Sequence, residues 1–155
     1  MRLLLCILLV ITLASCKNQT VAPEYPLDIF SVVTIENEIL EYTADFRYND
    51  GVSVFVIKKP SMLNGMKITV SDDVSVSYND INLTYDSFAE FGFTTFKDLH
   101  NVILLLNEQK PEFSNGGELL LCEVDYKGKT VKITADSKNF DVEKIIINNT
   151  TYYFD

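Results

Sequence analysis

The chain has no tryptophan, one histidine and three cysteines among its 155 residues. The single histidine, His100, and the cysteine of the mature region, Cys122, fall on different expected elements, so a catalytic Cys–His pair is not predicted. A glycine-rich phosphate loop, a CxxC pair and an HExxH zinc motif are also missing. These absences argue against common nucleotide, redox and zinc chemistries, and we expect a non-catalytic protein without a cofactor.

A long hydrophobic run is missing as well. The most apolar stretch, Leu3–Leu13, has eleven residues with Thr12 as its only polar member, and Arg2 precedes it. A membrane-spanning helix needs about 20 apolar residues. This length suits the apolar region of a secretory signal peptide instead.

The end of this run carries a recognisable motif. Leu13-Ala14-Ser15-Cys16 resembles the lipobox of bacterial lipoproteins, in which a branched apolar residue and two small residues precede a cysteine. The resemblance implies that residues 1–15 are removed, that Cys16 is linked to diacylglycerol and that the new N-terminus is acylated. It also implies an extracytoplasmic protein anchored by lipid to the cell membrane, or to the outer membrane if the host has one. The alternative is an ordinary signal peptide followed by a chance cysteine.

The lipobox leaves one cysteine to explain. Cys6 would leave with the signal and Cys16 would be capped by lipid. Cys122 lies in the apolar stretch LLLCEV, where a free cysteine acts as a small buried hydrophobic residue.

The charge is strongly acidic. The formal net charge is −9, and it becomes −10 without residues 1–15, which contain one arginine and no acid. Such a surface repels nucleic acid and anionic lipid headgroups. We therefore expect no nucleic-acid partner, and membrane contact through the lipid anchor rather than through basic residues.

The composition divides the mature chain into two parts. Residues 16–26 carry the lipidated cysteine and a segment with two prolines, which predicts an extended tether. Residues 27–155 are long enough for one domain with its own core. They predict a single β-rich domain.

Alternating apolar and polar residues dominate this domain. Asn49-Asp50-Gly51, Asn79-Asp80 and Lys127-Gly128 separate alternating segments and are typical of tight hairpins. The segment Val52–Ile57 is apolar on nearly both faces, which predicts a central strand covered on two sides. The fold expected is mainly β (α+β), with a curved antiparallel sheet or half-barrel of about ten strands. The expected strands lie near residues 28–35, 40–48, 52–57, 66–71, 74–78, 81–85, 119–126, 130–135, 142–147 and 151–154.

One helix is expected between Phe96 and Leu106. Thr95 as N-cap with Asp98 three residues later is similar to a capping box. Phe96, Leu99 and Ile103 belong to an apolar stripe so wide that the helix must be buried over much of its circumference. We expect this helix to cover the sheet, with His100 as a partly buried structural residue.

Four acids near predicted turns resemble the ligands of a calcium site in type. Asp72, Asp73, Asp80 and Asp86 lack the spacing of a calcium-binding loop. Aspartate is also favoured in turns for its own backbone. We predict no metal site.

The layout of sheet and helix resembles the lipoprotein-carrier superfamily of LolA and LolB. The stretch Val54–Leu63 is similar to that family's strand, basic residue, proline and loop. The chain lacks the family's long helix before the first strand and its tryptophans. The resemblance implies an unclosed barrel with a helical lid that carries an acyl chain or another apolar ligand on its concave face. The expected lining residues are Phe55, Ile57, Met62, Leu63, Met66, Ile68, Val76, Tyr78, Leu83, Leu99 and Ile103.

A second hypothesis belongs to another class. The core between sheet and helix is filled in this hypothesis, and the protein binds or regulates an envelope protein partner through a sheet edge or an acidic face. It would then have no ligand.

Overall fold

The computed structural model describes residues 20–39, 41–85 and 93–155. Its strands form one unclosed antiparallel sheet of twelve strands in the order β1-β8-β9-β10-β11-β12-β2-β3-β4-β5-β6-β7. The strands are β1 (Thr20–Val21), β2 (Ile29–Glu36), β3 (Glu41–Asn49), β4 (Val52–Lys59), β5 (Lys67–Val70), β6 (Val74–Tyr78), β7 (Ile81–Tyr85), β8 (Phe113–Asn115), β9 (Leu119–Tyr126), β10 (Lys129–Asp136), β11 (Val142–Ile147) and β12 (Thr150–Phe154).

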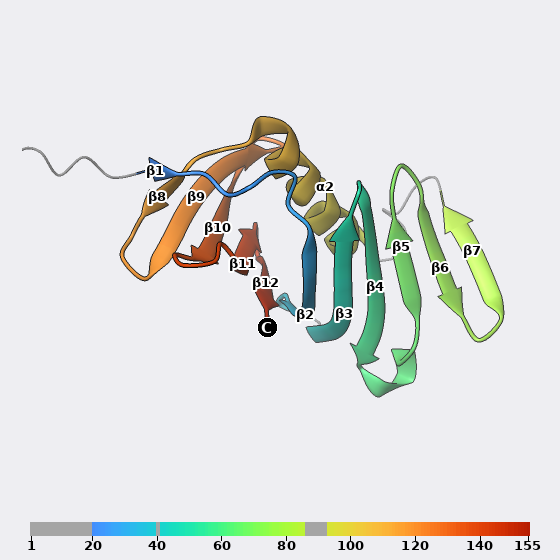
Figure 1. Cartoon of the computed structure of the whole chain (residues 1–155). Coiled ribbons are helices and arrows are strands. Elements are labelled where there is room, and N and C mark those ends of the chain that lie inside the picture. The colour runs from blue at the N-terminus through green and yellow to red at the C-terminus, as the bar shows by residue number, and fades with distance from the viewer. Residues whose placement is uncertain (1–19, 40, 86–92) are drawn as a thin grey trace, which may run out of the picture.

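The sheet consists of two meanders joined along one strand pair. Strands β2 to β7 follow one another along the chain and in space, and so do β8 to β12. The last strand, β12, pairs with β2 from Thr151 opposite Glu36 to Phe154 opposite Val33. Figure 1 shows the two meanders as wings on either side of this junction, with the helix running across both.

Tight turns with left-handed backbone set the register of the hairpins. Asp50 and Gly51 have φ of 48° and 73° between β3 and β4. Asn79 and Asp80, at 46° and 66°, do the same between β6 and β7. Two successive residues with positive φ match the right-handed twist of hairpin strands. The turn residues of the sequence therefore fix which side chains share a face.

The expectation of a mainly β protein is confirmed, but the number of strands is twelve rather than about ten. The two additional strands, β1 and β8, have two and three residues and pair with each other. An alternation pattern needs more residues than these strands contain. Tertiary pairing alone defines them.

Strand β1 lies within residues 16–26, the segment expected to be an extended tether. Thr20 and Val21 lie in the sheet opposite Ser114 and Phe113. The Tyr25 hydroxyl donates a hydrogen bond of 3.0 Å to the carbonyl oxygen of Pro111. Part of this segment therefore packs on the domain instead of extending away from it.

Helix α2 (Thr94–Gln109) covers the inner face of the sheet. Its C-terminus is closed by Lys110 in the left-handed conformation, whose amide donates to the Leu106 carbonyl oxygen. The predicted capping box is wrong, because Phe93 is the N-cap, no side chain caps the helix and Thr95 lies inside it. The buried side of the helix consists of Phe96, Leu99, His100, Val102, Ile103 and Leu106.

Strand β4 was expected to be covered on both faces, and this is wrong. Ser53, Phe55 and Ile57 are buried beneath the helix, whereas Val52, Val54 and Val56 on the other face keep part of their surface exposed. Among the described residues, one α-helix, α2, covers the sheet, and it covers only the inner face. The outer valines favour a strand through their β-branched side chains without being in the core.

The helix–sheet contact should dominate stability. Leu99 is fully buried in this contact, so we expect Leu99→Ala to lower the free energy of unfolding by about 2–5 kcal/mol through lost burial and the remaining cavity. Leu121 on the outer face of β9 is a matched control, because it is 47% exposed and Leu121→Ala should cost at most about 0.5 kcal/mol. Urea denaturation of both variants measures the difference, and equal losses would contradict this account of the core.

Candidate functional site

The structure divides the eleven expected lining residues into two groups. Seven of them lie in the packed core between the sheet and α2, and four lie toward the β7 edge. In the second group Met62 is 75% and Leu83 45% exposed, while Leu63 and Tyr78 are half-buried. The buried group consists of Phe55, Ile57, Met66, Ile68, Val76, Leu99 and Ile103.

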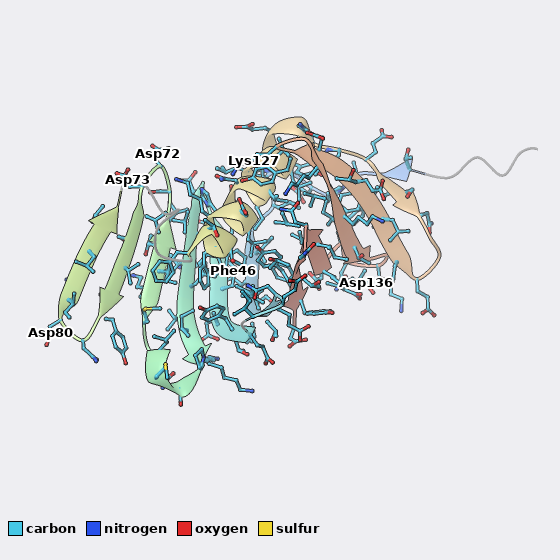
Figure 2. The ribbon with its side chains drawn as sticks, turned by 180° about the vertical axis from the view of Figure 1, so that it is seen from behind. Phe46, Asp72, Asp73, Asp80, Lys127 and Asp136 are labelled. Carbon is cyan, nitrogen blue, oxygen red and sulfur yellow. The ribbon has the colours of Figure 1, made fainter. Side chains whose placement is uncertain are left out.

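Aromatic packing fills the space beneath the helix. Phe55 stacks on Phe46 with ring centroids 4.7 Å apart and meets Phe96 of α2 edge-on at 4.9 Å. Figure 2 shows Phe46 pointing toward the helix among the side chains of the inner face. Helix α2 thus occupies the place where an acyl chain was expected. A ligand could reach the buried lining residues only after α2 moves.

Polar contacts hold α2 at its N-terminal half. The Tyr152 hydroxyl of β12 donates a hydrogen bond of 2.8 Å to the Thr95 carbonyl oxygen. The Tyr126 hydroxyl donates to Asp98 Oδ1 at 2.8 Å, and Lys127 Nζ lies 3.3 Å from the same oxygen. Asp98 therefore binds β9 and its turn rather than capping its own helix.

A second polar tie secures the C-terminal half of α2. Asn107 Oδ1 accepts a hydrogen bond of 2.7 Å from the Leu27 amide, and Asn107 Nδ2 donates to the Tyr48 hydroxyl at 3.2 Å. One side chain thus links the helix to β3 and to the segment before β2. These contacts fix the helix in its place over the inner face.

His100 is the only charged or titratable residue of α2 that points fully into the core. It is 1% exposed, and its Nδ1 lies 3.0 Å from the Ser53 Oγ of β4, which is also buried. Burial lowers the pKa of His100 to about 4, with a further lowering by Lys97 and an opposing effect of Asp72. The imidazole is therefore neutral at pH 7 and acts as a structural residue.

A separate cavity of about 410 Å³ lies where β12 ends between the first residues of β2 and β11. Its volume is within the range of roughly 300–1,000 Å³ of small-molecule sites. Six of its thirteen lining residues are apolar, five are acidic and none is basic. The apolar ones are Leu27, Ile29, Phe30, Phe140, Val142 and Phe154, and the acids are Asp28, Asp136, Asp141, Glu143 and Asp155.

Two of these acids are engaged in the turn between β10 and β11. Asp136 Oδ1 accepts hydrogen bonds from the amides of Lys138 and Asn139, and the Asn139 side-chain amide donates to Asp141 Oδ2. They stabilise the turn that forms one wall of the cavity. Among the residues that the structure describes, no three His, Cys, Asp or Glu side chains converge to hold a metal ion.

The four acids near the β5–β7 turns do not form a calcium site among the described residues. Asp80 lies at the opposite end of β6 from Asp72 and Asp73, as Figure 2 shows, and Asp86 lies outside the described residues. Asp80 instead occupies a left-handed turn position. The hairpin turns account for these three described acids.

Of the two cysteines expected in the mature chain, Cys122 lies within the described residues and Cys16 does not. Cys122 is a buried free thiol on β9, and burial, followed by the neighbouring Glu123, raises the pKa of its thiol. It therefore has the environment expected of a small apolar core residue. Cys16 lies outside the described residues, so its lipidation stays a prediction.

Sequence patterns did not predict the residues that line the cavity. They come from residues 27–31 at the start of β2, from the β10–β11 turn with the start of β11, and from the end of β12, and the first of these segments lies more than one hundred residues before the other two. Their local patterns are those of ordinary strands and an Asp-rich turn. No signal in the sequence brings these three segments together.

No model of a known protein family matches the chain. A search among curated proteins finds no significantly similar sequence. In the part of the chain that the structure describes, helices long and apolar enough to span a membrane are also not found.

The buried neutral histidine predicts acid destabilisation. Because its pKa is near 6.5 in the unfolded chain and about 4 in the folded protein, the unfolded state binds the proton more tightly. Stability should fall as the pH drops from about 6.5 to 4, by about 3 kcal/mol from this group. The difference in unfolding free energy between wild type and His100→Gln, measured from pH 7 to 4, isolates this effect from the carboxylates. Parallel pH profiles would refute it.

Proposed function

We propose that this chain is a non-catalytic, lipid-anchored bacterial lipoprotein whose half-barrel binds a small apolar ligand. The cavity at the end of β12 is the observation that carries this proposal, because its volume and its six apolar lining residues suit a short alkyl or aromatic group. Each buried CH₂ group would contribute about 0.8 kcal/mol. Affinity should therefore increase with chain length until the cavity is full.

The charge of the residues that line the cavity limits which classes of ligand can bind. Five carboxylates and no lysine or arginine line the cavity. The side chains of Asp28 and Glu143 have no hydrogen bond or ion pair within the described residues, whereas the carbonyl oxygen of Asp155 accepts a hydrogen bond of 2.8 Å from Ser31 Oγ. A fatty-acid carboxylate would be repelled there. The ligand that fits is apolar with a neutral or cationic head.

The proposed anchor would hold the domain close to the membrane. β1 begins at Thr20, so residues 16–19 would separate the lipid from the sheet. Four residues span at most ~14 Å, compared with ~35 Å for a free tether of ten residues. The β1–β8 end of the sheet would then face the headgroups.

Filling the cavity should abolish ligand binding. Val142 is half-buried at the start of β11 and lines the cavity, so Val142→Trp should occupy part of its volume. We expect the soluble chain of residues 17–155 to bind the neutral fluorescent probe N-phenyl-1-naphthylamine saturably, and Val142→Trp to weaken binding at least tenfold. Dodecylamine and dodecanol should displace the probe better than laurate.

The outer-face variant Leu121→Trp is the control for the added tryptophan, because Leu121 does not line the cavity. It should bind the probe as wild type does. A wild-type protein without saturable binding would refute the ligand proposal.

The lipid anchor has its own test. In a bacterium that processes lipoproteins, the full chain should incorporate labelled palmitate and sediment with membranes, because two or more acyl chains give stable anchoring. Cys16→Ser should abolish both, whereas Cys122→Ser should leave both unchanged. An unmodified thiol at Cys16 in the mass spectrum of the native protein would contradict the anchor.

The packing beneath α2 favours a second candidate function. Seven expected lining residues are buried in a filled core, which suits the hypothesis of an envelope interaction protein without a ligand. Capture of one stoichiometric protein partner from detergent-solubilised envelopes, combined with no probe binding, would support this function over the first.

A further inference from the structure

Beyond the end of β12 the sheet has a gap one strand wide, and the cavity described above lies in this gap. β12 lies between β11 and β2 (Figure 1), and its pairing with β2 runs as far as Phe154 opposite Val33. β2 begins at Ile29 and β11 at Val142, so the first residues of both strands line the cavity. Neighbouring strands lie about 4.8 Å apart, so two strands that flank a third leave room for one strand between them.

Phe30 presents unpaired backbone groups to this gap. Val32 and Asp155 exchange two backbone hydrogen bonds, one of 3.3 Å from the Val32 amide and one of 3.0 Å from the Asp155 amide. In an antiparallel strand the amide and carbonyl groups of every second residue point to the same side, so those of Phe30 point into the gap. Neither group has a hydrogen-bond partner among the described residues. A strand edge with unpaired groups favours the addition of another strand.

A break in register at the start of β11 gives the gap an acidic side. Lys144 lies opposite Thr134 and Val142 opposite Ala135, so Glu143 has no opposite residue in β10. An extra residue of this kind redirects a side chain next to the bulge. Glu143 is exposed and lines the cavity. Its carboxylate is therefore accessible to a cationic group in the gap.

We propose that this gap binds the free N-terminus of another polypeptide as a short strand between β2 and β11, antiparallel to both. A peptide bond is about 1.33 Å long, whereas an ammonium group stays about 2.8 Å from a carboxylate oxygen. The first residue of the peptide therefore lies two positions beyond Asp155, opposite Phe30. Its amino group donates to the Phe30 carbonyl oxygen, and its carbonyl oxygen accepts from the Phe30 amide. This ligand would occupy the cavity of the proposed function, so the proposal rests on that function.

Charge complementarity favours an N-terminus at this place. Five of the thirteen lining residues are acidic and none is basic. An α-amino group has a pKa of about 7.7–8.0, so most of it is protonated at pH 7 and attracted to these carboxylates. A peptide C-terminus would be repelled instead. The N-terminus of this chain would be acylated in the proposed anchor, so the bound N-terminus belongs to a different protein.

The walls of the cavity favour an apolar side chain at the second residue of the peptide. Side chains alternate between the two faces of a sheet, so the second residue lies on the same face as Phe154, opposite Ile29. Ile29, Phe140 and Phe154 line the cavity, and Phe154 meets the core residue Phe46 edge-on at 6.0 Å between ring centroids. A leucine at the second position would bury apolar surface against these residues.

Binding of a defined peptide to the full chain in detergent micelles tests the proposal. The probe is Ala-Leu-Ser-Lys-amide with rhodamine on its lysine side chain, and fluorescence anisotropy follows its binding against empty micelles. We expect saturable binding, and at least tenfold weaker binding when the first residue lacks its amino group. D-leucine at the second position should also weaken binding at least tenfold, because it turns the side chain to the other face of the sheet.

Charge reversal in the protein tests the same contact independently. Glu143→Lys should weaken binding of the peptide at least tenfold, because it replaces an attractive carboxylate with a cation. Glu41→Lys is the matched control, because Glu41 is exposed and does not line the cavity, and its affinity should stay within twofold of wild type. Both positions are exposed, so thermal unfolding should show folded proteins.

Hydrogen exchange at Phe30 tests the strand pairing itself. The peptide should slow exchange of the Phe30 amide at least tenfold, whereas dodecylamine, which has no peptide groups, should leave it unchanged. Unchanged exchange with the bound peptide, or equal binding of the peptide without its amino group, would overturn the proposal. If N-phenyl-1-naphthylamine binds but the peptide neither binds nor displaces it, the cavity of the proposed function stands and this ligand is wrong. If neither binds, both proposals fail.

Discussion

The packing of α2 against the inner face of the sheet is the contact on which the rest of the structure depends. An unclosed sheet of twelve strands cannot bury its apolar face by itself. The helix supplies the missing layer with Phe96, Leu99 and Ile103, which are fully buried among residues of the two meanders. Both wings contact the same helix, so the helix joins them into one core.

Polar groups on the helix determine its position more narrowly than apolar burial can. Hydrophobic packing is not directional, whereas the bonds of Asp98 to Tyr126 and of Asn107 to Tyr48 are. The His100–Ser53 contact adds a buried polar pair, and burial disfavours the charged form of its imidazole. The same helix thus fills the concave face. Because it carries His100, the stability of this packing should fall at low pH.

The features with potential function lie where the helix does not reach. The acid-lined cavity and the unpaired backbone groups of Phe30 lie beyond the end of β12. A filled centre with an open cavity suits binding at the periphery of the sheet.

The sequence by itself determined the mainly β class, ten of the twelve strands and the buried helix, because alternation, hairpin turns and a wide apolar stripe are local patterns. It also determined that Cys122 would be a buried free thiol. Tertiary structure alone decided the pairing of β1 with β8, the single-sided burial of β4 and the use of Asp98 by Tyr126. The cavity also depends on the tertiary structure, because Leu27 and Phe154, which are far apart in the sequence, both line it. These features depend on contacts between distant segments, and no local pattern records which segments meet.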